Sequence, residues 1–204
     1  MTSIRSFVNQ LLKKHNKITV VSGLPRSGTS MMMSALQAGG MVLLVDDIRG
    51  ADWNNPKGYY EYERVKKLQK GDTEWLPKAC GKVVKIISAL IEYLPDTHHY
   101  QIIFMERDMD EILSSQKRML GGDGFDEETN ISDEEMRQSF ESHLVDVKNW
   151  MKDKDWIQTL FVSYNKALQH PLQVFQQVSE FLDHRVDPKK MIKVVDSDLY
   201  RERS

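Results

Sequence analysis

Cysteine is almost absent from this chain of 204 residues, because Cys80 is its only one. A single cysteine excludes an intrachain disulfide framework and a cysteine-based zinc cluster, and it fits a reducing compartment. Long hydrophobic runs are missing as well, since no stretch approaches the roughly 18 apolar residues of a membrane span. The N-terminal segment also lacks the continuous apolar core of a signal peptide. We therefore expect a cytoplasmic protein without a membrane partner.

Charge of one sign is not in excess either. The 28 Lys and Arg residues face 30 Asp and Glu residues, which gives a formal net charge of −2. No overall field therefore attracts a polyanion, and we expect no nucleic-acid partner. The six histidines do not stand at the helical spacing of paired metal ligands, so we expect no metal site.

Short apolar runs alternate with helix-prone segments along the chain. Hydrophobic residues make up 40% of the sequence and charged ones 28%, which is a globular balance that suits one domain over residues 1–204. Strands are expected at 17–23, 41–45, 82–88, 101–105 and 158–164, and helices after residue 28, at 61–70, at 110–120 and after Ser132. Such alternation predicts an α/β fold, a P-loop-type parallel β-sheet flanked by helices on both faces.

The segment 23–30, GLPRSGTS, joins the first expected strand to a helix. Glycines at this spacing let backbone N–H groups converge on an anion, and the positive end of the helix dipole adds to the attraction. Thr29 stands where nucleoside-triphosphatase loops carry lysine, and the cation comes earlier, as Arg26. The pattern predicts a phosphate-binding loop that does not hydrolyse ATP. Its binding residues would be Pro25, Arg26, Ser27, Gly28, Thr29 and Ser30.

The same residues resemble the 5′-phosphosulfate loop of sulfotransferases that use 3′-phosphoadenosine 5′-phosphosulfate, whose members carry Lys or Arg where Arg26 stands. A second segment, IIFMERDMDEILSSQ, is similar to the family's strand and helix that hold the 3′-phosphate, with Arg107 and, eight residues later, Ser115 at the matching positions. Further similarity, closest to short bacterial sulfotransferase-like proteins, covers most of residues 18–183. The resemblance implies sulfuryl transfer from this donor to a hydroxyl or amine of a small-molecule or carbohydrate acceptor. The product nucleotide would be 3′-phosphoadenosine 5′-phosphate, and no metal would be needed.

Catalytic residues follow from the same resemblance. Arg26 is the leading candidate, because its guanidinium would stabilise the negative charge that develops on the bridging oxygen of the leaving phosphate. Cytosolic members carry Lys-Thr-His at a strand end; Lys85 matches the lysine, but Ile87 stands in the place of the histidine. Carbohydrate-acting members use a glutamate in the region of GYYEYE, where we favour Glu61 as the base. Glu61 is equally explained as a carboxylate at a helix start, whereas Lys85, on an apolar strand, needs a partner.

Two other functions are compatible with the sequence. A non-catalytic nucleotide-binding or regulatory protein of the same fold would account for Ile87, and a P-loop small-molecule kinase would account for the strand and helix pattern, although Thr29 opposes it. Taken alone, Arg107 is also explained by a salt bridge to Asp108, Asp110 or another surface acid. The sequence identifies neither the acceptor nor the oligomeric state. Residues that could line an acceptor pocket are Asp46, Asp47, Trp53, Tyr59 and Tyr60.

Overall fold

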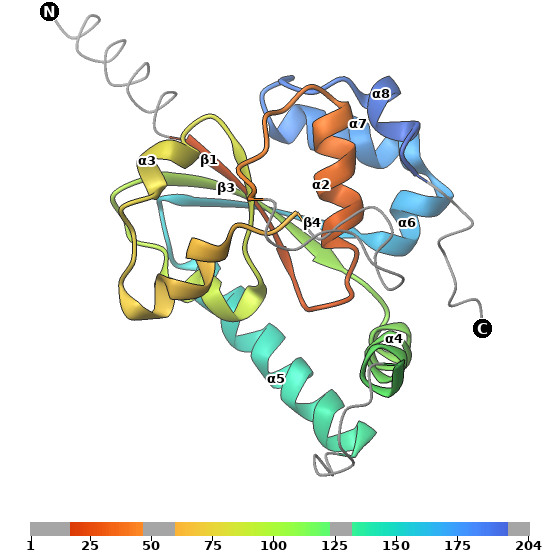
Figure 1. Cartoon of the computed structure of the whole chain (residues 1–204). Helices are drawn as coiled ribbons and strands as arrows, with labels where there is room; N and C mark the ends of the chain where they lie inside the picture. The colour runs from red at the N-terminus through yellow and green to blue at the C-terminus, as the bar shows by residue number, and fades with distance from the viewer. Residues whose placement is uncertain (1–16, 47–59, 123–131, 196–204) are drawn as a thin grey trace, which may run out of the picture.

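A computed structural model describes residues 17–46, 60–122 and 132–195, which form helices packed around a central sheet (Figure 1). The sheet has four strands in the order β2-β1-β3-β4. All neighbouring pairs are parallel, so the predicted α/β fold with a parallel sheet is confirmed. The strands are β1 (Lys17–Gly23), β2 (Val83–Lys85), β3 (His99–Glu106) and β4 (Ile157–Ser163).

Helices cover both faces of the sheet, as the apolar strands predict. Successive residues of β1 point to opposite faces, so that Val20 belongs to one hydrophobic core and Val21 to the other. The Val21 side is covered by α2 (Thr29–Ala38), α6 (Tyr164–Gln169), α7 (Pro171–Phe181) and α8 (Pro188–Ile192). The Val20 side is covered by the 3₁₀ helices η1 (Glu63–Lys70) and η2 (Ser88–Tyr93), by α3 (Leu76–Ala79) and by the C-terminal part of α5 (Asp133–Lys152).

The carboxyl ends of the strands meet at one edge of the sheet. The register places Val21 beside Lys85, Gly23 beside Met105, and Glu106 beside Ser163. From β1 the chain runs to β2 on one side and later returns to β3 on the other, so the strand order reverses between β1 and β3. In open α/β sheets, ligands bind outside the carboxyl ends of the strands at such a reversal. The segments after β1 and β3 are therefore the first place to look for a site.

Two of the strand predictions need correction. Residues 41–45 do not form a strand, because only Leu43 makes a bridge, to Val83, while Val42 is 62% exposed. The apolar run at 82–88 gives the shorter strand β2, which ends at Lys85 because the chain turns into η2 at Ser88. Apolar composition alone did not reveal where backbone pairing would stop.

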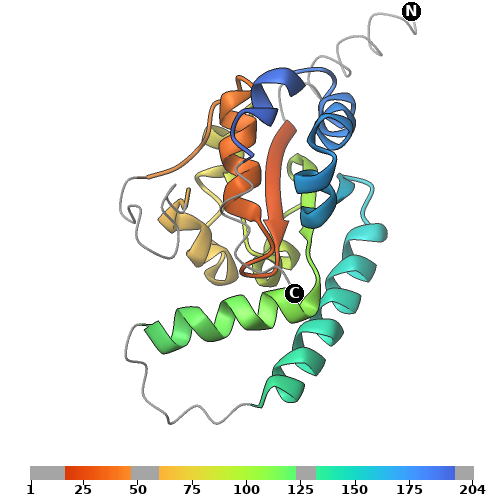
Figure 2. The ribbon, with the colours of Figure 1, turned by 90° about the vertical axis from the view of Figure 1, so that its right-hand side faces the viewer.

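Figure 2 shows α4 (Met109–Gly122) running across below the end of β1, with the N-terminal half of α5 extending past it and away from the sheet. The predicted helix after Ser132 begins with a capping box. The Ser132 hydroxyl accepts a hydrogen bond from the backbone N–H of Glu135, and the Glu135 carboxylate accepts one from the N–H of Ser132. In α5, Val147 and Met151 are buried, while the N-terminal half of the helix lies beyond the sheet. In the described parts of the chain, no helix has the length and apolar character needed to cross a membrane.

Candidate functional site

The loop between β1 and α2 is a tight turn with unusual backbone angles. Ser27 donates its backbone N–H to the carbonyl of Leu24 at 3.2 Å, and φ is +145° at Gly23, +69° at Arg26 and +96° at Gly28. A Cβ on Gly23 would lie 2.5 Å from the Met105 carbonyl oxygen, so only glycine fits there. Arg26 holds a left-handed conformation that is rare for a residue with a side chain, a strain that is often found at functional sites.

The N-terminus of α2 faces the same edge of the sheet. Gly28 is its N-cap and offers no side chain to the exposed N–H groups, and the first turn carries no acidic residue. The first N–H groups of a helix have no intrahelical acceptor, and the helix dipole is positive at this end. The predicted strand–loop–helix arrangement is therefore present, and anion binding at 28–30 stays a prediction. The predicted contacts of Thr29 and Ser30, which are half-buried, and of the exposed Pro25 stay predictions.

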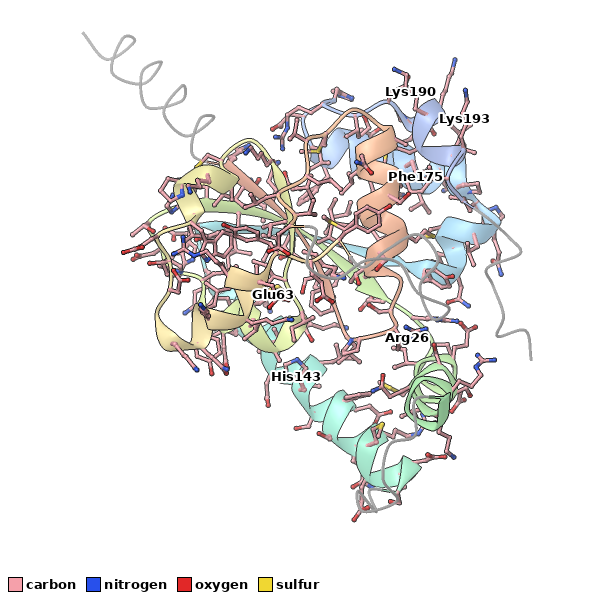
Figure 3. All side chains as sticks on the ribbon, viewed as in Figure 1. Arg26, Glu63, His143, Phe175, Lys190 and Lys193 are labelled. Carbon is pink, nitrogen blue, oxygen red and sulfur yellow. The ribbon has the colours of Figure 1, made fainter. Side chains whose placement is uncertain are left out.

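Arg107 and Ser115 lie directly against this loop. Arg107 Nη1 donates a hydrogen bond to the carbonyl oxygen of Arg26 at 3.0 Å, and Arg26 Nε donates one to Ser115 Oγ at 2.9 Å. Figure 3 places Arg26 beside α4, the helix that carries Ser115. Two segments that lie 81 residues apart in sequence are thus brought together at the reversal of strand order. Their predicted roles as ligands of one nucleotide remain predictions.

Arg107 forms an ion pair with an acid, as its salt-bridge explanation predicts, but the partner is Glu111 and not Asp108 or Asp110. Arg107 Nε donates to Glu111 Oε2 at 2.7 Å, and its side chain is 8% exposed. Asp108 instead accepts the backbone N–H of Asp110, and Asp110 pairs with Arg137 of α5. The Arg107 side chain is therefore largely buried and held by partners within the protein.

Sequence reasoning missed three side chains that surround Arg107. Asn165 Nδ2 donates to Glu111 Oε1 at 2.7 Å, and the Tyr164 ring lies 4.6 Å from the Arg107 guanidinium carbon. A Cβ on Gly28 would lie 2.3 Å from Cδ2 of Tyr164, so the same ring also packs against the loop. Burial raises the pKa of Tyr164 above its ordinary value. The available signals were the one-turn spacing of Glu111 from Arg107, and the position of Tyr164 and Asn165 directly after a strand.

The side chains of Lys85 and Glu61 meet at the end of β2. Lys85 Nζ lies 3.9 Å from Glu61 Oε1, and the two side chains are 8% and 20% exposed. Lys66 Nζ reaches the other Glu61 oxygen at 3.7 Å. The helix-start carboxylate is Glu63, the first residue of η1, rather than Glu61. The structure therefore brings together the two residues predicted on the acceptor side, and it supplies the partner that a buried lysine requires.

An imidazole lies near the position where the resemblance lacks a histidine. Ile87 is 43% exposed, and the next residue, Ser88, has its hydroxyl 2.9 Å from Nε2 of His143 on α5 (Figure 3). No sequence spacing connects His143 with β2, because α5 comes much later in the chain, after β3 and α4. This residue could not have been found without the fold.

The remaining predicted residues differ in their surroundings. The Ser27 side chain is 1% exposed and lies against Gly23, and no hydrogen-bond partner for its hydroxyl is found among the described residues. Of the expected acceptor loop, Asp46 accepts the backbone N–H of Glu63 at 2.7 Å, whereas Asp47, Trp53 and Tyr59 lie outside the described residues. Within residues 17–46, 60–122 and 132–195, no cluster of His, Cys, Asp and Glu suited to a metal ion is found.

Comparison with known proteins gives a distant structural neighbour. No protein-family model and no curated protein matches the chain. Among solved structures, it is similar to a sulfotransferase domain from the curacin biosynthetic pathway, with 13% sequence identity, a TM-score of 0.48 and coverage of 92% of each chain. A likeness this distant does not show what the chain does, so its function has to be inferred from its own residues.

Proposed function

We propose that this protein is a sulfotransferase that moves a sulfuryl group from 3′-phosphoadenosine 5′-phosphosulfate to a hydroxyl or amine of a small-molecule or carbohydrate acceptor. One observation carries the proposal: Arg107, predicted to bind the 3′-phosphate, donates a hydrogen bond to the 23–28 loop, predicted to bind the 5′-phosphosulfate. A ligand with two anionic groups on one ribose needs two cationic sites side by side. The strand-order reversal supplies that position.

On the donor side, each anionic group has its own set of residues. The N–H groups at the start of α2 would bind the 5′-phosphosulfate, with Arg26 on the bridging oxygen where charge develops. Arg107 and Ser115 would bind the 3′-phosphate, and Ser115 would exchange its bond with Arg26 for one with the ligand. Arginine suits both places because its planar fork can bind two oxygens of one anion.

On the acceptor side, Glu61 and Lys85 would complete the reaction. The acceptor oxygen or nitrogen forms a bond to sulfur while the bond between sulfur and the bridging phosphate oxygen breaks, which releases 3′-phosphoadenosine 5′-phosphate. The proton of the acceptor passes to Glu61, and Lys85 stabilises the oxygens of the transferred group. A sulfuryl group carries one negative charge, so the cationic side chains and the helix dipole would suffice without a metal ion.

The test is a transfer assay that uses labelled donor, a broad panel of hydroxyl and amine acceptors, and a chelator of divalent metals. We expect labelled product and stoichiometric 3′-phosphoadenosine 5′-phosphate in the presence of the chelator. Magnesium-dependent turnover of ATP would instead favour the small-molecule kinase. Tight nucleotide binding without transfer to any acceptor would favour the regulatory protein, and either result would overturn the proposed reaction.

A further inference from the structure

The Glu111 carboxylate forms hydrogen bonds to two separate segments of the candidate site. One oxygen of its carboxylate accepts from Arg107 Nε at 2.7 Å, and the other accepts from Asn165 Nδ2 at 2.7 Å. Arg107 follows β3, and Asn165 lies in α6, directly after β4. The carboxylate is 15% exposed, so these bonds are largely shielded from water.

This contact limits how the guanidinium of Arg107 can turn. Nε is turned toward Glu111, one face lies over the Tyr164 ring, and Nη1 points to the Arg26 carbonyl. One terminal nitrogen, Nη1, therefore contacts the 23–28 loop. Because arginine has a long side chain with many rotamers, an unsupported guanidinium would hold this direction only part of the time.

An acidic group here has an electrostatic cost. A carboxylate beside Arg107 repels an incoming phosphate, so considerations of charge alone predict that removing Glu111 tightens anion binding. Positioning predicts the opposite, because a guanidinium that has lost its support must be ordered again when the ligand binds. The two explanations differ in the sign of the effect, which makes the role of Glu111 measurable.

We infer that Glu111 is a positioning residue: its carboxylate, shared with Asn165, holds the Arg107 guanidinium with Nη1 toward the 23–28 loop and thereby sets the affinity for the second phosphate of the nucleotide. The inferred effect of Glu111 on nucleotide affinity rests on the proposed function. Its inferred effect on the orientation of Arg107 does not, because that orientation is a property of the protein without ligand.

The test compares Glu111→Ala with Glu111→Gln by calorimetric titration of adenosine 3′,5′-bisphosphate and of adenosine 5′-phosphate. Glutamine removes the charge but keeps an oxygen for Arg107 and an amide that can bond a rotated Asn165 side chain. We expect Glu111→Ala to weaken the bisphosphate about tenfold and the monophosphate little, and Glu111→Gln to keep most of the ratio between the two affinities. The control is Asp110→Ala, which removes a neighbouring acid that is 79% exposed and pairs with Arg137; it should leave the ratio unchanged.

Three outcomes would overturn this inference: bisphosphate binding to Glu111→Ala that equals or exceeds wild type, equal weakening of both nucleotides, or the same change in Asp110→Ala. A wild-type protein that does not prefer the bisphosphate contradicts the proposed function instead. In that case the inference is decided by the NMR signal of the Arg107 Nε–H group in the ligand-free protein. A signal protected from exchange in wild type and Glu111→Gln, but lost in Glu111→Ala, supports positioning, and an unprotected signal in wild type refutes it.

Discussion

At the scale of single residues, the candidate site depends on two arginines whose geometry leaves little freedom. Arg107 uses Nε, Nη1 and one face of its guanidinium at the same time, for Glu111, the Arg26 carbonyl and the Tyr164 ring. Arg26 holds a left-handed backbone conformation while its side chain reaches Ser115. Both residues were predicted from the sequence, but their mutual contact was not, because it depends on how β1 and β3 pair.

The first prediction concerns the shape of Arg107. In Arg107→Lys the charge is kept, but a single ammonium group cannot contact Glu111, the Arg26 carbonyl and the Tyr164 ring at the same time. We expect affinity for adenosine 3′,5′-bisphosphate to fall about tenfold or more, as measured by calorimetry. The matched control is Arg137→Lys, whose side chain pairs with Asp110 and is 30% exposed; it should bind as wild type does. Unchanged affinity in Arg107→Lys would mean that only the charge matters.

The second prediction separates the backbone of Arg26 from its side chain. Arg26→Gly and Arg26→Ala both remove the guanidinium, so both should lose transfer activity by about 100-fold or more. Glycine, however, relieves the strain at φ +69°. Thermal or chemical denaturation should therefore find Arg26→Gly more stable than Arg26→Ala by about 1 kcal/mol. Equal stability of the two variants would show that the loop relaxes when the arginine is removed.

At the scale of elements, the loop and the helices around it were only partly predictable. The capping box at Ser132 and the strand–loop–helix unit around 23–30 are local structures, and the residues that form each of them are neighbours in the sequence. The predictions of a strand at 41–45 and of a longer β2 were wrong, because the length of a strand depends on pairing with the backbone of a neighbouring strand. The sequence of one segment does not contain that information. Glu111 and Asn165 were missed for the same reason, since they meet across two elements.

The third prediction concerns the contact between the loop and α6. A methyl group in Gly28→Ala would lie 2.3 Å from the Tyr164 ring, at a residue whose φ is +96°. We expect a loss of about 2–4 kcal/mol in the free energy of unfolding, from the clash and the backbone strain together. Gly40→Ala is the control, because φ is +107° there and nothing lies within 4 Å. If both variants lost the same free energy of unfolding, the contact between Tyr164 and the loop would not account for the effect of Gly28→Ala.

The fourth prediction concerns the start of α5. Ser132→Ala removes the hydroxyl that accepts from the Glu135 backbone N–H, and we expect a loss of about 1 kcal/mol at pH 7 in chemical denaturation. Hydrogen bonds from the Ser132 backbone and hydroxyl hold the pKa of Glu135 below its usual value. The capping box therefore contributes fully above the ordinary glutamate pKa, and its contribution falls as the pH drops through the lower folded value. A difference between wild type and Ser132→Ala that did not shrink in acid would contradict this account.

At the scale of the whole molecule, the sheet topology explains why distant residues form one site. Parallel strands place all their carboxyl ends at one edge, so the 23–28 loop, Arg107, Tyr164 and Lys85 come from four strand ends. Glu61 reaches Lys85 from the segment before η1. The class of fold was predictable because apolar strands alternate with helices. The position of His143 was not, because α5 reaches back to η2 only in the folded protein.

The central claim is that two neighbouring anion sites at this edge bind one nucleotide. The most direct measurement is calorimetric titration of the wild-type protein, with a metal chelator present, by adenosine 3′,5′-bisphosphate and by adenosine 5′-phosphate. We predict micromolar affinity for the bisphosphate, at least about tenfold weaker binding of the monophosphate, and loss of this preference in Arg107→Ala. Equal affinity for the two nucleotides in the wild-type protein would contradict the claim.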